Sequence, residues 1–259
     1  MINSSSLRLC ISDLHLDDSH PERTQALVDL LAYFDERISE LYILGDLFNY
    51  WVGDDHRPAC AERVSAATRA LPYTGWIFGN RDFLLGTDGY CEESRMTPLP
   101  QVHHLDMAGK RAILCHGDQL CINDIEHQRN RRLYITSNYQ RMLLGKSVDE
   151  RLQIANQSRY VSSQRKQTLE EDIIDVDPQE VERMLVGERA ELLVHGHTHR
   201  PALHRHKQGR RLVLGEWTTR GWVVIESLDR PHIILSSFAI PFDAASFQQL
   251  ATIGANQQA

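Results

Sequence analysis

Five short apolar runs in this sequence each end in a carboxylate, amide or imidazole residue, and this pattern constrains the fold more than any other feature. Each run is short enough to be a buried strand, and a glycine stands beside the polar residue in most of them. Polar residues that follow buried strands collect at one edge of a sheet, where α/β proteins bind their ligands. The runs are Leu7–Ser12, followed by Asp13 and His15; Leu41–Leu44, followed by Asp46; Gly75–Phe78, followed by Asn80; Arg111–Cys115, followed by His116; and Leu192–Val194, followed by His197 and His199.

Segments with helical periodicity alternate with these runs. Glu22–Arg37 carries its leucines on one helical face, and Pro58–Leu71 and Pro178–Gly187 are also predicted to be helices. This alternation of buried strand and helix predicts an α/β fold. Near the end of the sequence we expect antiparallel strands at Arg211–Leu214, Trp222–Glu226 and His232–Ser236, and then a short helix and a polar tail within Asp243–Ala259.

The composition is that of an ordinary globular protein. With 259 residues, 42% hydrophobic and 24% charged, the chain is expected to form a single domain over residues 1–259. It has no secretory signal and no apolar stretch long enough to span a bilayer, so we expect a cytoplasmic protein. The five cysteines are scattered and include no CxxC pair, which predicts reduced thiols.

The segment from Asp124 to about Leu169 is polar, basic and without strand signals. From His127 to Thr168 it carries seven Arg and two Lys against two acidic residues, although the whole chain has a formal net charge of −7. We predict a helical cap insertion, residues 122–170, that lies over the ligand-bearing edge, with an amphipathic helix at Arg129–Leu144. Its charge suits an anionic substrate or membrane surface, although a solvated helical face is the commoner explanation. The overall charge argues against a nucleic-acid partner.

The seven strand-end residues form a set of oxygen and nitrogen donors without sulfur. A surface turn rich in histidine would explain Leu192–Arg200 alone, but the whole set predicts a centre for two divalent cations bridged by a carboxylate. These donors without a thiolate favour manganese or iron over calcium or a structural zinc. We assign Asp13, His15, Asp46 and His199 to one cation and Asp46, Asn80, His116 and His197 to the other, with Asp46 as the bridge.

Other histidines and aspartates near these motifs are assigned separately. His195 points away from its neighbours on an extended strand, so we expect it to be a buried supporting residue. His103 and His104 lie outside any motif and are expected at the surface. Asp54 and Asp55 either orient metal-bound histidines or lie in a solvated loop, and the sequence leaves both alternatives open.

The order of these motifs resembles that of the calcineurin-like metallophosphoesterases, and the likeness spans essentially the whole chain. The resemblance implies a sandwich of two mixed sheets flanked by helices. It also implies hydrolysis of a phosphate ester or anhydride by a hydroxide held between two metal ions. The motifs that carry it are Asp13-x-His15, Gly45-Asp46, Gly79-Asn80-Arg81-Asp82, His116-Gly117-Asp118 and Gly196-His197-Thr198-His199.

One departure from the family narrows the substrate class. Many members carry a histidine after the asparagine of the third motif, where this chain has Arg81. Arginine cannot act as a general acid near neutral pH, but its guanidinium can neutralise a diphosphate. Because a phosphate leaving group needs little protonation, Arg81 favours a pyrophosphate substrate over an alkyl phosphomonoester.

The sequences around the motifs are most similar to one branch of the family, the UDP-2,3-diacylglucosamine diphosphatases of lipid A biosynthesis. The stretches that carry this similarity are Tyr42–Asp55, Gly79–Gly86, His116–Cys121 and His195–Ala202. The resemblance implies cleavage of a nucleotide-sugar lipid to UMP and 2,3-diacylglucosamine 1-phosphate, with manganese as the most favoured metal. It further implies peripheral contact with the cytoplasmic face of the inner membrane and no stable protein partner.

The resemblance also implies residue roles. We expect Asp46, Asn80, Arg81 and His116 to be catalytic. The chain departs from this branch at Leu169, where a lysine is common, and at the mildly apolar Met142–Lys146. A soluble UDP-sugar or dinucleotide pyrophosphatase therefore stays an alternative, and a non-catalytic scaffold is disfavoured because all seven metal ligands are present. The expected substrate contacts are Asn80, Arg81, Asp124, Arg159, Ser162, Lys166 and His197.

Overall fold

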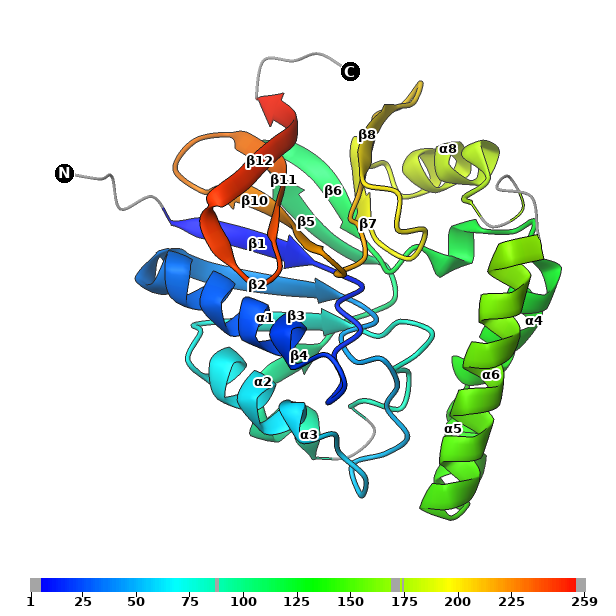
Figure 1. Ribbon diagram of the computed structural model, residues 1–259. Coiled ribbons are helices and arrows are strands. Elements are labelled where there is room, and N and C mark those ends of the chain that lie inside the picture. Colours follow the sequence, from blue (N-terminus) through cyan, green and yellow to red (C-terminus); the bar gives the residue numbers. More distant parts are fainter. Residues whose placement is uncertain (1–5, 87–88, 169–172, 174, 255–259) are drawn as a thin grey trace.

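The computed structural model describes residues 6–86, 89–168, 173 and 175–254, and its strands form two mixed sheets (Figure 1). The larger sheet has the order β12-β11-β10-β1-β2-β3-β4, and the smaller has the order β5-β6-β7-β9-β8. Strands β1 to β4 are parallel, as are β6, β7 and β9. The strands are β1 Leu7–Ile11, β2 Ile38–Leu44, β3 Thr74–Ile77, β4 Met96–Pro98, β5 His103–Met107, β6 Lys110–Leu114, β7 Leu192–His195, β8 Ala202–Arg205, β9 Arg210–Val213, β10 Arg220–Ser227, β11 His232–Ala239 and β12 Asp243–Gly254.

Apolar side chains alternate between the two faces of the central strands. They pack the molecule into four layers, which are helices, the larger sheet, the smaller sheet and helices. On β1, Leu9 packs with helix α1 (Pro21–Phe34), whereas Cys10 packs into the core between the sheets. On β7, Leu193 packs instead with helix α8 (Pro178–Gly187) on the outer side of the smaller sheet. Strands buried on both faces appear in a sequence as continuous apolar runs, which is why these strands could be predicted. The predicted α/β fold, two mixed sheets flanked by helices, is confirmed.

The three predicted helices are present: α8 has the predicted bounds, and the ends of the other two differ by a few residues from the expected ones. The first predicted helix stops at Phe34, and a short 3-10 turn, η1 (Asp35–Arg37), completes the expected range. The second is α2 (Cys60–Arg69), which lies beside α1 on the same face of the larger sheet (Figure 1). Two short helical segments complete this part of the chain, α3 (Tyr90–Glu93) and η2 (Asp118–Leu120).

Among the described residues between η2 and α8, three long helices stand beside the sandwich (Figure 1): α4 (Ile125–Tyr134), α5 (Ser137–Leu144) and α6 (Val148–Thr168). The prediction of one helix over Arg129–Leu144 is wrong, because Thr136 has an extended backbone and begins a new helix there. Its hydroxyl accepts a hydrogen bond from a backbone N–H of the following turn, a common way for threonine to start a helix.

The expected helix within Asp243–Ala259 is also wrong, because β12 occupies Asp243–Gly254, and residues 255–259 lie outside the described part of the chain. β12 pairs along β11, with Ile253 fully buried opposite Ile233. A mostly polar edge strand has little hydrophobic pattern in its own sequence, so pairing with the neighbouring strand determines that it is a strand. The segment expected as an antiparallel strand at Arg211–Leu214 is β9, which pairs parallel to β7 in the other sheet and antiparallel to β8.

Two expectations about the chain as a whole can be compared with the structure. Among the described residues, no helix combines the length and apolar character needed to cross a membrane. The five cysteines are buried free thiols, as predicted. Burial raises the pKa of the Cys60 and Cys91 thiols to about 12, which keeps both side chains protonated near neutral pH.

Candidate metal centre

The two sheets bring the carboxyl ends of their parallel strands to a common rim. In Figure 1 the arrowheads of β1 and β2 point toward the side of the molecule on which α4, α5 and α6 stand. All seven predicted ligand residues follow such strand ends. In the larger sheet Asp13 and His15 follow β1, Asp46 follows β2 and Asn80 follows β3, and in the smaller sheet His116 follows β6, and His197 and His199 follow β7.

One group of donor atoms consists of Asp13, His15, Asp46 and His199. The Nε2 atom of His15 lies 3.1 Å from Oδ2 of Asp46 and 4.0 Å from Oδ1 of Asp13. The Nε2 atom of His199 lies 3.1 Å from the same Oδ1 of Asp13. Donor atoms about 3 Å apart can share one cation at bond lengths of about 2 Å. This group therefore has the chemistry and spacing of a metal site.

A second group surrounds the imidazole of His116. Its Nε2 atom lies 3.2 Å from Oδ1 of Asn80, 3.3 Å from Nδ1 of His197 and 3.8 Å from Oδ1 of Asp46. Its other ring nitrogen, Nδ1, lies 2.8 Å from the carbonyl oxygen of Leu44. A hydrogen bond from Nδ1 to this carbonyl leaves Nε2 as the nitrogen that faces the other donors.

Asp46 lies between the two groups. Its Oδ2 atom faces His15 and its Oδ1 atom faces His116, so one carboxylate offers an oxygen to each group. Two triads, one of Asp13 with His15 and His199 and one of Asp13 with Asp46 and His116, each hold their donor atoms within 4.8 Å of one another. A donor set of carboxylates, an amide and imidazoles arranged in this way fits two divalent cations with one shared carboxylate.

Nearby imidazoles stabilise the charges of the two buried carboxylates. Burial alone would raise the pKa of Asp13 and Asp46, because a charged form loses solvation in the interior. The imidazole of His199 beside Asp13, and that of His116 beside Asp46, outweigh burial and hold the pKa of each carboxyl group well below its usual value. Both carboxylates are therefore ionised, as metal ligands must be.

The surroundings also shift the pKa of two other groups at the rim, His197 and Asp82. Burial and the neighbouring imidazoles of His127 and His116 hold the pKa of His197 well below its usual value, and neutral imidazole is the form that binds metals. Burial and the adjacent Asp46 carboxylate raise the pKa of Asp82 to about 7. Asp82 accepts hydrogen bonds from the backbone N–H groups of Gly79 and Leu47, each at 2.8 Å, and so joins the turns that follow β2 and β3.

The backbone at the rim adopts a conformation that side chains rarely permit. Most of the candidate ligands have a φ in the left-handed region, and glycines next to them allow close approach. A Cβ atom at Gly79 would overlap the Asp46 carboxylate, and one at Gly196 would overlap that of Asp13. The ligands with positive φ are Asp13 (55°), His15 (48°), Asp46 (52°), His197 (63°) and His199 (58°).

Arg81 lies beside the shared carboxylate. Its backbone N–H donates to Oδ1 of Asp46 at 2.9 Å, and its side-chain Nε lies 3.4 Å from Oδ2 of the same residue. Its guanidinium also donates to Oδ1 of Asn49 at 2.9 Å. These contacts fix a permanent positive charge at the edge of the donor cluster.

A cavity of about 850 Å³ connects the rim with the three neighbouring helices. Asn80, Arg81 and Glu216 line it from the sandwich. Leu133, Tyr134, Leu143 and Ile154 are among the apolar side chains that line it from α4, α5 and α6. This volume lies in the range of small-molecule sites, and the lining combines polar and charged side chains with a comparable apolar surface.

The predicted substrate contacts lie in different surroundings. Arg159 and Ser162 of α6 line the cavity, and the guanidinium carbon of Arg159 lies 5.7 Å from the centre of the Tyr50 ring. Asp124 begins α4, where its side chain accepts a hydrogen bond from the His127 backbone N–H at 3.0 Å. Lys166 belongs to α6, but its side chain lies outside the described part of the chain.

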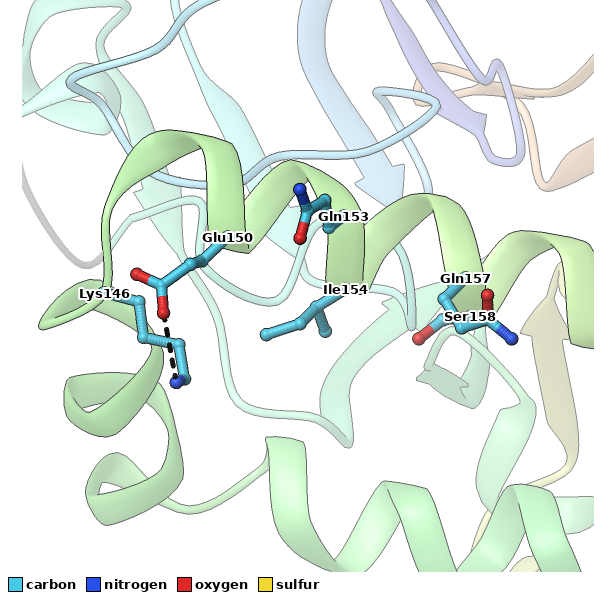
Figure 2. A pocket seen from close by; sticks show the side chains of 6 residues that line it. All are labelled: Lys146, Glu150, Gln153, Ile154, Gln157 and Ser158. Atoms are coloured by element: carbon cyan, nitrogen blue, oxygen red, sulfur yellow. Dashed lines mark ion pairs between the residues drawn. The ribbon is translucent and has the colours of Figure 1, made fainter.

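A second hollow, of about 520 Å³, lies along α6 (Figure 2). At one end of it Lys146 and Glu150 form an ion pair at 3.9 Å, and Ile154 lines both hollows. Its remaining lining residues, Gln153, Gln157 and Ser158, are neutral and polar. None of the predicted ligands lines it, so the chemistry belongs to the larger cavity.

Three carboxylates that contact residues of the rim were not predicted from the sequence. Asp82 and Asp118 stand inside the predicted motifs, so their positions in the sequence were a usable signal. Glu216 lies in the loop between β9 and β10, where no motif marks it, yet its oxygens lie 2.9 Å from Nδ1 of His15 and 3.1 Å from Nδ1 of His199.

The structure also shows the contacts of the aspartates and histidines that were predicted to lie outside the ligand set. His195 is fully buried, and its Nδ1 lies 2.8 Å from the carbonyl oxygen of Gly196, in agreement with a supporting role. Asp54 accepts hydrogen bonds from the Trp51 indole at 2.9 Å and from the Tyr90 backbone N–H at 2.6 Å, and does not orient a ligand histidine through either. Among the described residues, Asp55 does not contact a ligand histidine either, because it pairs with Arg151 at 2.8 Å.

The two histidines outside the motifs lie away from the rim. His104 is exposed and lies 3.1 Å from Glu188, and His103 is half-buried against the Tyr42 ring.

Comparison with known proteins identifies the family to which the chain is similar. A family model described as "Calcineurin-like phosphoesterase" matches residues 8–201. A UDP-2,3-diacylglucosamine hydrolase from Tolumonas auensis is 40% identical over 224 residues, which are 83% of this chain and 91% of that protein. Proteins of the same name from Marinobacter nauticus and Pseudomonas savastanoi pv. phaseolicola are 39% and 38% identical, over 86% and 89% of this chain and 94% and 95% of theirs.

Solved structures with the same arrangement of sheets are much more distant in sequence. A single mutant of Vps29 from Entamoeba histolytica matches with a TM-score of 0.50 and 13% identity, over 95% of this chain and 98% of that one. Vps29 from Chaetomium thermophilum matches with the same TM-score and 10% identity, over 97% of this chain and 100% of that one. At such identities the likeness shows the fold alone.

Proposed function

The chain belongs to the calcineurin-like phosphoesterase family, and we propose that it hydrolyses the diphosphate of UDP-2,3-diacylglucosamine to UMP and 2,3-diacylglucosamine 1-phosphate in lipid A biosynthesis. One observation carries this proposal. The cavity that borders the donor cluster is lined both by Arg81, which suits a diphosphate, and by apolar side chains of α4, α5 and α6, which suit acyl chains.

Seven residues would hold two cations in this enzyme. We assign Asp13, His15, Asp46 and His199 to one ion and Asp46, Asn80, His116 and His197 to the other, in agreement with the two groups of donor atoms. Oxygen and imidazole donors without a thiolate favour manganese among the divalent ions. The chemistry that two such ions supply is a water molecule ionised near neutral pH and neutralisation of the phosphate charge.

The protein's own groups orient the substrate and stabilise its charge. Arg81 would pair with the diphosphate, because its guanidinium is permanently charged and is held in place by Asn49 and Asp46. Asn80 contributes a neutral oxygen donor and so adds no negative charge beside an anionic substrate. His116, whose Nδ1 is fixed by the Leu44 carbonyl, keeps its other nitrogen directed at the reaction centre.

We propose that residues 122–170 form a cap over the diphosphate site and accommodate the lipid. Leu133, Tyr134, Leu143 and Ile154 would contact the acyl chains, since all four line the cavity. Substrate contacts are assigned to Asn80, Arg81 and His197 at the rim and to Asp124, Arg159, Ser162 and Lys166 in the cap.

The same helices provide a surface suited to the cytoplasmic face of the inner membrane. Ile125, Met142 and Tyr160 expose 71%, 50% and 63% of their area, in a segment with an excess of arginine. Exposed apolar side chains among basic residues favour peripheral contact with anionic lipids. Co-sedimentation with vesicles tests this part: binding to phosphatidylglycerol vesicles that weakens at high salt is expected, and equal binding to neutral vesicles would contradict it.

A comparison of substrates tests the proposed reaction. The manganese-loaded enzyme should hydrolyse UDP-2,3-diacylglucosamine with a kcat/KM at least about a hundredfold above that for UDP-glucose, because burial of apolar surface contributes several kcal/mol. The matched variant Asp46→Asn should lose activity toward both substrates by about 10³-fold, since the shared carboxylate is gone. Equal kcat/KM for the two substrates would instead support a soluble UDP-sugar pyrophosphatase.

A further inference from the structure

We infer that Glu216 is a positioning residue that holds the imidazoles of His15 and His199 in the orientation needed to bind one of the two proposed cations. This inference rests on the metal centre of the proposed function and assigns to one of its two sites a carboxylate from outside the ligand set. Glu216 lies in the loop between β9 and β10, about 200 residues from His15 in the sequence.

A single carboxylate contacts both rings. The Oε1 atom of Glu216 lies 2.9 Å from Nδ1 of His15, and its Oε2 atom lies 3.1 Å from Nδ1 of His199. The opposite ring nitrogens, the two Nε2 atoms, each lie 3.1 Å from a carboxylate oxygen, of Asp46 for His15 and of Asp13 for His199. Both imidazoles therefore lie between Glu216 on one side and the proposed ligand carboxylates on the other.

This geometry also selects the tautomer. An ionised carboxylate can only accept hydrogen bonds, so both rings carry a proton on Nδ1 where they face Glu216. In the neutral imidazole the other nitrogen, Nε2, then has a free lone pair directed at the cation site. A carboxylate that fixes a histidine ligand in this way strengthens metal binding, and its loss typically weakens affinity about 10–100-fold.

The loop that carries Glu216 is anchored independently of its carboxylate. The backbone N–H of Trp217 donates to the carbonyl oxygen of Asp13 at 3.0 Å. The Trp217 side chain is fully buried, and its ring packs edge-on against Phe238 with the centroids 5.2 Å apart. A substitution at the half-exposed Glu216 should therefore leave the loop and the fold in place.

Loss of the Glu216 carboxylate should weaken cation binding at only one of the two sites. The imidazole of His116, in the second group, is fixed by the Leu44 carbonyl oxygen at 2.8 Å and not by a side chain. Glu216 has no contact with His116 among the hydrogen bonds and ion pairs of the described residues. Removal of the Glu216 charge thus distinguishes the two sites, which a general loss of stability would not do.

The most discriminating substitution is Glu216→Gln, which preserves the shape of the side chain and replaces one of its two acceptor oxygens with an NH₂ group. The amide oxygen can still accept from one imidazole, but its NH₂ group faces the other Nδ1 and requires it to accept. That ring must then carry its proton on Nε2, where it blocks the metal. The matched control is Glu188→Gln, because Glu188 forms a carboxylate–imidazole pair with His104 at 3.1 Å on the surface.

Titration of the metal-free, full-length protein with Mn²⁺, followed by calorimetry and by electron paramagnetic resonance of free Mn²⁺, tests the inference without substrate. We expect two ions to bind to the wild type and to Glu188→Gln. We expect one ion to bind unchanged to Glu216→Gln and the other to bind about 10–100-fold more weakly. The melting temperature of the metal-free variant should equal that of the wild type.

The outcomes separate this inference from the proposed function. Two ions bound by Glu216→Gln with wild-type affinities would overturn the role of Glu216 and leave the metal centre standing. Weakening of both sites together with a lower melting temperature of the metal-free protein would also overturn it, because a structural role would then explain the loss. Fewer than two ions bound by the wild type would overturn the ligand assignment itself.

Discussion

At the scale of single residues, the candidate ligands are held by a backbone that is unfavourable when considered alone. A left-handed φ at a residue other than glycine costs on the order of 1–3 kcal/mol when the surroundings impose strain, and such residues cluster at functional sites. Here the turns support one another. The N–H of Asp13 donates to the Gly45 carbonyl at 3.1 Å, that of His15 to the Asp46 carbonyl at 3.0 Å, and that of His197 to the Asp13 carboxylate at 2.9 Å.

A methyl group at Gly79 tests how tightly these turns are packed. A Cβ atom there would overlap both the carboxylate and the backbone nitrogen of Asp46, so Gly79→Ala should displace the shared ligand. Since displacement of a reacting group by about 1 Å can cost about a hundredfold in rate, kcat/KM should fall by about this factor, with a loss of bound manganese. Steady-state kinetics and metal analysis of the purified variant measure both effects.

The control for this substitution is Gly187→Ala, at the end of α8, where nothing lies within 4 Å of the added Cβ. It should retain wild-type kcat/KM and metal content. Full activity of Gly79→Ala would show that Asp46 does not need its present position.

At the scale of elements, a buried carboxylate ties α4 to the sandwich. Asp118, in the turn that follows β6, accepts a hydrogen bond from the Arg131 Nε at 2.9 Å and another from the Tyr134 hydroxyl, and both donors belong to α4. Burial would raise the pKa of Asp118, but the neighbouring His127, His116 and Arg131 outweigh it and hold the pKa well below its usual value.

The substitution Asp118→Asn should therefore destabilise the protein. Removal of one partner from a buried ion pair costs about 3 kcal/mol, and the loss should appear in the free energy of unfolding measured with urea in the presence of a chelator. Because the folded-state pKa of Asp118 is lowered, its contribution is complete above the ordinary carboxyl pKa of about 4 and declines as the pH falls below it.

The difference between wild type and Asp118→Asn should thus be constant from about pH 6 to 8 and shrink toward more acidic pH. The exposed Asp106→Asn, on β5, serves as the control and should change the free energy of unfolding by less than about 0.5 kcal/mol. A difference that grows on acidification would contradict this account of Asp118.

At the scale of the whole molecule, the cavity is lined jointly by the sandwich and by α4, α5 and α6, and both contribute polar and apolar side chains. Leu133 of α4 lines the cavity and is 46% exposed, so Leu133→Asp should fold normally. Because contact with a leucine side chain contributes about 1.5–3 kcal/mol, the KM for UDP-2,3-diacylglucosamine should rise about 10–100-fold with little change in kcat.

Kinetics in mixed detergent micelles measure this change. The control is Leu228→Asp, because Leu228 is 38% exposed in the turn between β10 and β11 and does not line the cavity. An unchanged KM for Leu133→Asp would argue against the cap as the lipid-binding element.

The parts of this molecule that could be predicted from sequence are those whose signal is local. The central strands are buried on both faces and appear as apolar runs, so the residues that follow them, such as Asp46 and His116, could be placed at one rim. The break at Thr136 and the strand β12 could not be predicted, because a cap and a partner strand outweighed the local pattern. Glu216 could not be found at all, because only the tertiary fold brings it to His15.

Product analysis in oxygen-18 water tests the central claim most directly. The manganese-loaded protein is incubated with UDP-2,3-diacylglucosamine in H₂¹⁸O, and both products are examined by mass spectrometry. The proposed reaction predicts UMP with one oxygen-18 atom on its phosphate and unlabelled 2,3-diacylglucosamine 1-phosphate, with no products after treatment with a chelator. Oxygen-18 on the sugar phosphate, or no release of UMP, would contradict it.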